Sequence, residues 1–253
     1  VITGGAGIIG TALSEGIAGA GMKTVILDLD EKAASDKANS LKQKFGAEVI
    51  GIGANVLEKN SLEEARKKIH DQFGPIDFLI NGAGGNSPKA TTQAEQIEKE
   101  DLEHLENTFY GLEMEGFDKV FDLNFKGTLL PTMVLTQDML KAQKGSVVNI
   151  SSMNSYKPLT KIPAYSAAKA SVNNFTEWLS VHLAKTGIRV NAIAPGFFLT
   201  QQNRFLLLDE KTGKPTSRGQ KIIANTPMGR YGEVEELQGV TLFLLSDLAK
   251  FIT

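Results

Sequence analysis

Short apolar runs alternate with longer amphipathic stretches along the whole chain of 253 residues. This alternation is typical of a parallel β-sheet whose strands are joined by helices that cover both faces. No repeat and no low-complexity linker interrupts it, so we expect one α/β domain over residues 1–253 with a doubly wound parallel sheet. The expected strands are residues 24–28, 48–52, 78–81, 146–151 and 189–194. The clearest expected helices are residues 31–45, 61–73, a stretch around 117–141, 164–185 and 233–246.

The composition excludes several kinds of site and partner. The chain has no cysteine, which rules out disulfides, thiolate nucleophiles and zinc–thiolate sites, and we expect no metal centre. Its formal net charge of −2 provides no broad positive field for nucleic acid or anionic lipid. No apolar run is long enough for a transmembrane helix and the first residues have no basic region of a signal peptide, so a cytoplasmic location is expected. Residues 1–3 and 251–253 both fall inside apolar runs, and we expect both termini to be clipped.

Two segments are long for loops of a compact domain, in which connections of about 4 to 6 residues are usual. The first, residues 84–116, has eight acidic residues against two lysines, a formal charge of −6. We call it the insertion. The second, residues 197–229, has five basic residues against two acidic ones, a formal charge of +3. We call it the lid, and we expect both segments to cover a substrate.

A glycine-rich motif follows directly after the first strand. Residues 5–10 read Gly-Ala-Gly-Ile-Ile-Gly, the pattern GxGxxG, at the start of an apolar-periodic helix. Glycines at these positions let the backbone turn tightly and approach a pyrophosphate at the helix N-terminus, where free N–H groups favour an anion. The motif alone is weak evidence for a dinucleotide, since glycine-rich turns between a strand and a helix are common.

Asp28 strengthens the assignment of a dinucleotide site. It lies 18 residues after Gly10 at the end of the second expected strand, where an acidic residue accepts a hydrogen bond from the ribose 2′-hydroxyl and repels a 2′-phosphate. Leu29 follows it in place of an arginine, so we expect NAD rather than NADP. Two alternatives stay open: Asp28 could simply begin a turn with Asp30, or Asp30 could take its role.

Tyr165 and Lys169 are four residues apart at the start of an expected helix, so their side chains share one face. Such a pair is usually a solvated surface, but the preceding strand ends at Ser151 and Ser152, and open α/β sheets bind ligands beyond the carboxyl ends of strands. A phenol titrates near pH 10, and a cation about 4 Å away would lower its pKa by at most about three. We therefore expect Lys169 to bring Tyr165 close to the working pH as an acid/base. Ser152 can hydrogen-bond a carbonyl oxygen on which charge develops.

The order and spacing of these residues resemble the short-chain dehydrogenase/reductase family over essentially the whole chain. The resemblance rests on residues 3–10, 81–84, 165–169 and 195–196, together with Asn124, Ser152 and Thr200. It implies a Rossmann-like fold, a homotetramer, and hydride transfer between NAD and a carbonyl or secondary alcohol. It also implies a catalytic tetrad in which Ser152, Tyr165 and Lys169 act directly and Asn124 anchors a water of a proton relay.

The resemblance assigns the cofactor contacts as well. Asn55, Val56 and the turn at residues 81–84 would flank the adenosine half of the cofactor, and Thr200 would hold the nicotinamide carboxamide. The full set of expected cofactor contacts is Gly4, Gly7, Ile9, Gly10, Asp28, Asn55, Val56, Asn81, Ala83, Gly84, Tyr165, Lys169, Pro195 and Thr200.

The insertion and the lid must recognise the substrate. Residues 86–89, 200–204 and 226–230 are similar to the subgroup that interconverts fructuronate and mannonate. A hexuronate carries one carboxylate and several hydroxyl groups, which a basic lid and amide side chains could bind. We therefore expect a keto-sugar acid as the small-molecule substrate, with Arg204 on its carboxylate and with Lys89 turned inward from a helix near residues 93–107. The expected substrate contacts are Asn86, Lys89, Asn154, Gln202 and Arg204.

Two other interpretations stay open. A dehydrogenase of gluconate-type or neutral sugars would use the same hydride chemistry, and a catalytically silent dinucleotide-sensing protein could be built on the same fold. A complete tetrad argues against the sensor, which needs neither Tyr165 nor Lys169.

Overall fold

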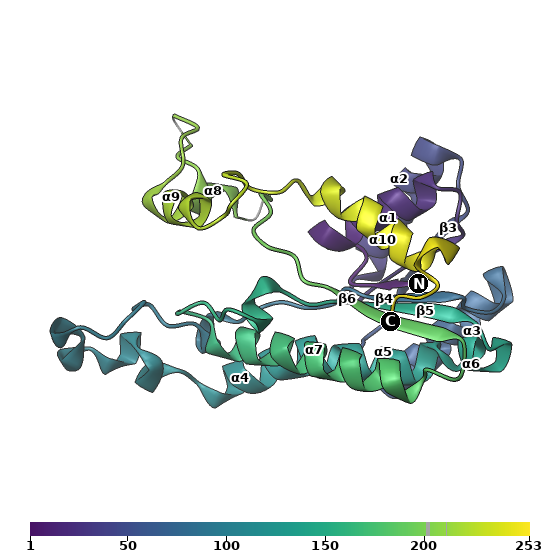
Figure 1. Ribbon diagram of the computed structural model, residues 1–253, viewed down its shortest axis with the longest axis horizontal. Coiled ribbons are helices and arrows are strands. Elements are labelled where there is room, and N and C mark those ends of the chain that lie inside the picture. The colour runs from purple at the N-terminus through teal and green to yellow at the C-terminus, as the bar shows by residue number, and fades with distance from the viewer. Residues whose placement is uncertain (201–202, 211) are drawn as a thin grey trace.

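Six parallel strands form one sheet in the order β3–β2–β1–β4–β5–β6 in the computed structural model, which describes residues 1–200, 203–210 and 212–253 (Figure 1). The strands are β1 (Ile2–Thr3), β2 (Thr24–Asp28), β3 (Val49–Gly53), β4 (Phe78–Asn81), β5 (Gly145–Ile150) and β6 (Ile188–Ile193). The chain builds outward from β1 in one direction and then returns to build in the other, which is the doubly wound topology that the sequence predicts. The switch point between β1 and β4 is where open α/β sheets bind ligands.

The strands lie close to their predicted positions. β2 and β4 match the predicted ranges, and β3, β5 and β6 are each shifted by one residue. Side chains alternate between the two faces, so that Val147 belongs to the core on one face and Val148 to the core on the other. Both faces of the sheet are therefore buried, which explains why these strands are continuous apolar runs in the sequence.

Helices cover both faces of the sheet (Figure 1). The start and end of α2 follow from sequence signals, because the Asp30 side chain accepts from Ala33 N–H at its start and Gly46 takes a left-handed φ of 64° at its end. On one face lie α1 (Ile8–Gly19), α2 (Glu31–Phe45) and α10 (Leu237–Leu245), with the 3₁₀ turns η7 (Val234–Glu236) and η8 (Asp247–Ala249) flanking α10 in the chain. On the other lie α3 (Lys59–Phe73), α5 (Gly127–Leu135), α6 (Gln137–Ala142) and α7 (Pro163–His182).

The helix predicted around residues 117–141 is interrupted. It consists of α4 (Met114–Phe121), the π-helical turn η5 (Asp122–Lys126), α5 and α6. Pro131 inside α5 has no N–H with which to continue the helical hydrogen bonds, and the π turn is itself a break in the regular pattern. The interruption matters for function because Asn124 lies on the π turn and is completely buried.

The insertion does not form the helix predicted near residues 93–107. It folds instead into the 3₁₀ turns η1 (Pro88–Ala90), η2 (Lys99–Glu103), η3 (Leu105–Asn107) and η4 (Phe109–Gly111). The backbone N–H groups of Gln93 and Ala94 both donate to Asn107 O, so the ends of this segment meet and a continuous helix is impossible. In Figure 1 the insertion projects from the same end of the molecule as the lid, which contains α8 (Arg204–Leu207) and α9 (Ser217–Ala224).

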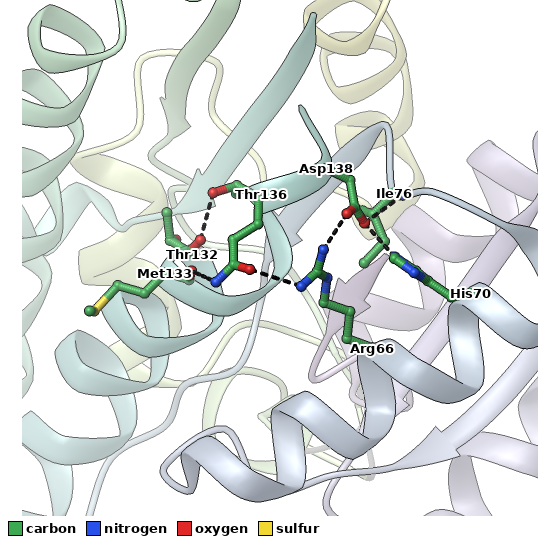
Figure 2. Close-up of polar contacts among 8 residues, drawn as sticks. Arg66, His70, Ile76, Thr132, Met133, Thr136 and Asp138 are labelled. Atoms are coloured by element: carbon green, nitrogen blue, oxygen red, sulfur yellow. Dashed lines mark hydrogen bonds and ion pairs between the residues drawn. The ribbon is translucent and has the colours of Figure 1, made fainter. Parts of the chain in front are cut away.

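A buried carboxylate joins α3 to α6. Asp138 of α6 accepts hydrogen bonds from Arg66 and His70 of α3 and from the backbone N–H of Ile76 (Figure 2). Burial disfavours the charged carboxylate, but these donors outweigh it and hold the pKa of Asp138 below its usual value. The cluster is a structural connection between two helices that the sequence analysis did not identify.

Two further findings concern the described part of the chain. None of its helices is long and apolar enough to cross a membrane. None of its histidine, aspartate and glutamate side chains gather in a group of three or more that could hold a metal ion.

Candidate active site

The glycine-rich turn leads from β1 directly into α1. Gly7 caps the N-terminus of α1 without a side-chain hydrogen bond to the first turn, and free N–H groups at a helix N-terminus favour an anion. A side chain on Gly10 would place its Cβ 2.1 Å from Gly4 O, and Gly4 itself has a left-handed φ of 62°. The turn therefore depends on glycine at both positions, and this close backbone packing fits a bound pyrophosphate.

Asp28 is held beside this turn. Its Oδ2 accepts a 3.0 Å hydrogen bond from the backbone N–H of Ala6, so the carboxylate lies at the carboxyl end of β2 next to the glycines. Asp30 is used differently, because its side chain caps α2 by accepting from Ala33 N–H at 3.0 Å. Of these two acidic residues, Asp28 is the one whose carboxylate lies beside the glycine-rich turn.

The residues expected around the adenosine differ in what their side chains contact. The Asn55 amide donates to Glu58 Oε1 at 2.9 Å at the surface. The Asn81 side chain is buried, and its amide nitrogen donates to Thr132 and Asn149. The Asn81 amide therefore joins β4 to α5 and β5, and the prediction that the turn at residues 81–84 flanks the adenosine concerns its backbone. The other residues of this group lie in the loops after β3 and β4: Val56, Ala83 and Gly84.

Three members of the predicted tetrad meet beyond the end of β5. Ser152, Tyr165 and Lys169 line one pocket of about 180 Å³, which Ile9, Gly84 and Pro195 also line. Ser152 caps the 3₁₀ turn η6 (Met153–Ser155), and Tyr165 and Lys169 lie in the first two turns of α7. Their helical spacing places Lys169 Nζ 5.8 Å from the centre of the Tyr165 ring. The glycine-rich turn and the tetrad therefore face the same space.

Burial controls the protonation of Tyr165 and Lys169. It lowers the pKa of Lys169 to about 8, and the ammonium donates a 2.7 Å hydrogen bond to Ile150 O. It raises the pKa of the Tyr165 phenol, and a hydrogen bond with Ser152 opposes this rise. That Lys169 brings Tyr165 close to neutral pH stays a prediction, since the ammonium donates here to the Ile150 carbonyl while its Nζ lies 5.8 Å from the centre of the Tyr165 ring. The phenol is protonated at neutral pH, which is the form that donates a proton.

Asn124 lies at the same pocket, on the π turn η5. Its amide nitrogen donates to Gly85 O at 2.6 Å, and its Oδ1 accepts from Gly85 N–H at 3.2 Å. A Cβ on Gly84 would lie 2.7 Å from Asn124 Oδ1 and 3.2 Å from Lys169 Nζ. Because residue 84 is a glycine, space remains between Asn124 and Lys169, and this space fits the close approach of a cofactor.

A larger hollow of about 500 Å³ adjoins the catalytic pocket at Gly196. The insertion, the loop between β5 and α7, and the lid all contribute to its lining, and its volume is in the usual range for small-molecule sites. The charged residues that line it are Glu95, Lys161, Arg218 and Lys221. None of these four was among the predicted site residues, although Arg218 and Lys221 have the spacing of one helix face.

The two substrate contacts predicted in the insertion do not line this hollow. Asn86 is exposed, and its amide donates to Thr91 Oγ1 at 2.9 Å. Lys89 forms ion pairs with Glu113 at 3.1 Å and with Glu115 at 2.8 Å. The expectation that Lys89 turns inward is therefore wrong, because its charge is used within the insertion.

The remaining predicted contacts lie near the hollow or at the base of the lid. Asn154 is buried in η6, and its Oδ1 has no hydrogen-bond partner among the described residues. Thr200 lies near the start of the lid, where its hydroxyl accepts from Asn203 N–H at 3.3 Å. Arg204 is exposed at the start of α8 and is not among the lining residues of the hollow. Gln202 lies outside the described residues.

Comparison with known proteins agrees with this geometry. Residues 1–211 match the family model described as short chain dehydrogenase. An uncharacterised oxidoreductase of Haemophilus influenzae is 49% identical over 247 residues, which cover 98% of this chain and 86% of that protein. A solved structure of a candidate D-mannonate oxidoreductase from Haemophilus influenzae, with bound NAD, is 48% identical with a TM-score of 0.92 and covers 98% of this chain and 87% of its own.

A more distant structure shows how far the likeness extends. The gluconate 5-dehydrogenase of Burkholderia cenocepacia, in complex with NADP and tartrate, is 27% identical with a TM-score of 0.82, and the match covers 100% of this chain and 89% of that one. The family model, the strand order and the Ser152, Tyr165 and Lys169 pocket all point to one kind of enzyme. The chain belongs to the short-chain dehydrogenase/reductase family and is an oxidoreductase that acts on CH–OH groups.

Proposed function

We propose that this enzyme uses NADH to reduce a keto-sugar acid, and that its substrate is fructuronate, which it converts to mannonate. The observation that carries the proposal is the hollow next to Tyr165, which has three basic side chains and one acidic side chain in its lining. Basic side chains of this kind bind a carboxylate. The 48% identity to a candidate D-mannonate oxidoreductase supports the same substrate.

The tetrad would supply the proton chemistry. Ser152 hydrogen-bonds the carbonyl oxygen of the substrate and stabilises the charge that develops there. Tyr165 donates its phenolic proton to that oxygen. Lys169, which is mainly protonated at neutral pH, stabilises the phenolate that results, and Asn124 anchors a water through which the proton is replaced. Bound NADH supplies the hydride.

The reductant in this proposal is NADH rather than NADPH. The Asp28 carboxylate beside the glycine-rich turn would accept from a ribose 2′-hydroxyl and would repel a 2′-phosphate. NAD is bound in the relative that is 48% identical, whereas the 27% identical gluconate 5-dehydrogenase binds NADP. The backbone at Gly4, Gly7, Ile9 and Gly10 would hold the pyrophosphate, and Pro195 and Thr200 would flank the nicotinamide.

The proposal includes a homotetramer that works in the cytoplasm. Two helices that cover one face of the sheet expose large apolar side chains, namely Met133 of α5 and Trp178 and Val181 of α7, at 61%, 57% and 77% of their surface. Large apolar side chains exposed on helices are typical of an interface between copies of a chain. In Figure 1, α5 and α7 cover the same face of the sheet.

The second candidate function is the reduction of a gluconate-type keto acid, which the likeness to gluconate 5-dehydrogenase favours. Oxidation of NADH with fructuronate, 5-ketogluconate and fructose distinguishes the candidates. We expect the highest kcat/KM for fructuronate and the lowest for fructose, which has no carboxylate. A higher kcat/KM for 5-ketogluconate would support the second candidate, and activity on fructose alone would overturn the sugar-acid class.

A further inference from the structure

One face of α9 is turned toward the hollow. Arg218, Lys221, Ile222 and Asn225 all line it, and their spacing of i, i+3, i+4 and i+7 is that of one side of a helix. Ile222 is partly buried on this face, and Arg218 and Lys221 line the hollow beside it. The lid therefore presents two cations to the space next to Tyr165.

These two cations differ in their partners. Lys221 forms an ion pair of 3.3 Å with Glu95 of the insertion, so its charge is balanced where the lid meets the insertion. The Arg218 side chain is exposed and makes no hydrogen bond and no ion pair with any of the described residues. The guanidinium of Arg218 is thus left without an anion at a position that lines the hollow.

A third cation faces the hollow from a different wall. Lys161 belongs to the loop before α7, and its side chain likewise makes no ion pair within the described part of the chain. Its backbone carbonyl accepts from Thr92 N–H at 2.9 Å, which fixes this loop against the insertion. Lys161 and Arg218 therefore add positive charge from two walls, and only Lys221 is offset by Glu95.

The hydrogen-bond geometry of a guanidinium indicates which of these cations binds a carboxylate best. Arginine donates two parallel hydrogen bonds to a carboxylate in a fixed fork, whereas a lysine ammonium acts as a point charge. Gly196 lines both the catalytic pocket and the hollow, so a substrate whose carbonyl lies at Tyr165 would extend past Gly196 into the space that Arg218 lines. Arg204, to which the sequence analysis gave this role, is exposed on α8 and does not line the hollow.

We propose, as an extension of the function proposed above, that Arg218 binds the carboxylate of the substrate and selects acids over neutral sugars. Lys161 is the second cation of this subsite, and Arg204 takes no part in it. The roles of Arg218 and Arg204 can be separated because the two residues lie on different helices of the lid.

The test is a titration of NADH-loaded enzyme with mannonate and with mannitol, which has a hydroxymethyl group in place of the carboxylate. Binding is followed by the fluorescence of NADH. Arg218→Gln is expected to weaken mannonate binding at least about tenfold, the effect of losing a charge-assisted hydrogen bond, and to leave mannitol binding unchanged. The mannonate affinity of Arg218→Lys is expected to lie between those of Arg218→Gln and the wild type. Lys214→Gln removes a charge from the lid outside the hollow and is the matched control, with no change expected.

Several outcomes would overturn the role of Arg218. These are an unchanged mannonate affinity in Arg218→Gln, an equal loss for mannitol, or an equally large loss in Arg204→Gln. The proposed function fails separately if wild type does not reduce fructuronate but binds gluconate or tartrate in an Arg218-dependent manner, and the role of Arg218 then stands. Wild-type enzyme that binds none of these carboxylates would overturn the role of Arg218 as well.

Discussion

At the scale of single residues, Lys169 determines how the reaction responds to pH. Burial lowers its pKa to about 8, and reduction needs its charge to stabilise the Tyr165 phenolate. With saturating NADH, kcat for fructuronate reduction is expected to be constant below pH 7 and to fall above pH 8 by up to about tenfold per pH unit. Arginine stays charged to about pH 12, so the same profile for Lys169→Arg is expected to break at a higher pH. A break at the same pH in both enzymes would show that another group titrates.

Asp28 should determine which reductant the enzyme prefers. We expect kcat/KM for NADH to exceed that for NADPH at least about tenfold, because a 2′-phosphate would meet a carboxylate. Asp28→Asn keeps an oxygen for the N–H of Ala6 but removes the charge, and it is expected to reduce this preference about tenfold. Asp30→Asn is the control, since Asn also caps a helix and Asp30 serves only α2. Equal values for the two reductants in wild type would contradict the role of Asp28.

At the scale of helices and strands, the sequence predicts regular elements well and irregular ones poorly. Strands were located within one residue because buried parallel strands are continuous apolar runs. The stretch 117–141 is predicted as helical but contains a π turn. The Asn124 side chain on this turn donates a hydrogen bond to Gly85 O, which is far from it in the sequence. The acidic segment 93–107 has no apolar face that packs on the core, so its folded-back turns are set by contacts such as those to Asn107 O.

The connection between α3 and α6 makes a prediction for stability. Asp138→Asn leaves Arg66 and His70 without their carboxylate, and we expect the free energy of unfolding at pH 7 to fall by about 2 to 3 kcal/mol. The pKa of Asp138 is lowered in the folded protein, so the stability it provides is present above its unfolded pKa of about 4 and is lost as the pH falls through its folded pKa. Urea unfolding of both proteins should show this difference shrinking below pH 4. A difference in the free energy of unfolding between the two proteins that does not change with pH would contradict this role of the Asp138 carboxylate.

At the scale of the whole molecule, the gathering of Ser152, Tyr165 and Lys169 in one pocket could be predicted from the sequence, and the lining of the hollow could not. Ser152, Tyr165 and Lys169 follow from a strand end and a helical spacing, both of which are local features of the sequence. Lys161 and Arg218 line one hollow only because the insertion and the lid pack together, with Glu95 and Lys221 in contact across 126 residues of sequence. No local pattern in the sequence records such a distant contact, so the sequence alone does not indicate which basic residues line the hollow.

The exposed apolar face of α5 and α7 predicts how the molecule associates. We expect sedimentation velocity to give a species of four chains for wild type and a smaller species for Val181→Glu, because a charge on this face would be buried between copies. Leu102→Glu in the insertion changes an exposed residue away from these helices and should leave the tetramer intact. A monomeric wild type, or a tetramer that survives Val181→Glu, would show that this face is not the interface.

The most direct test of the central claim is the turnover of Tyr165→Phe with NADH and fructuronate. The substitution removes only the hydroxyl group that donates the proton, so NADH binding is expected to stay at the wild-type level while kcat falls by about 10² to 10⁴. Tyr156→Phe, at an exposed tyrosine that caps η6, is the matched control and should keep full activity. Deuterated NADH establishes whether hydride transfer limits the rate. Under that condition, a loss of at least a hundredfold in Tyr165→Phe is the result we predict, and retention of more than about a tenth of wild-type turnover would contradict Tyr165 as the proton donor.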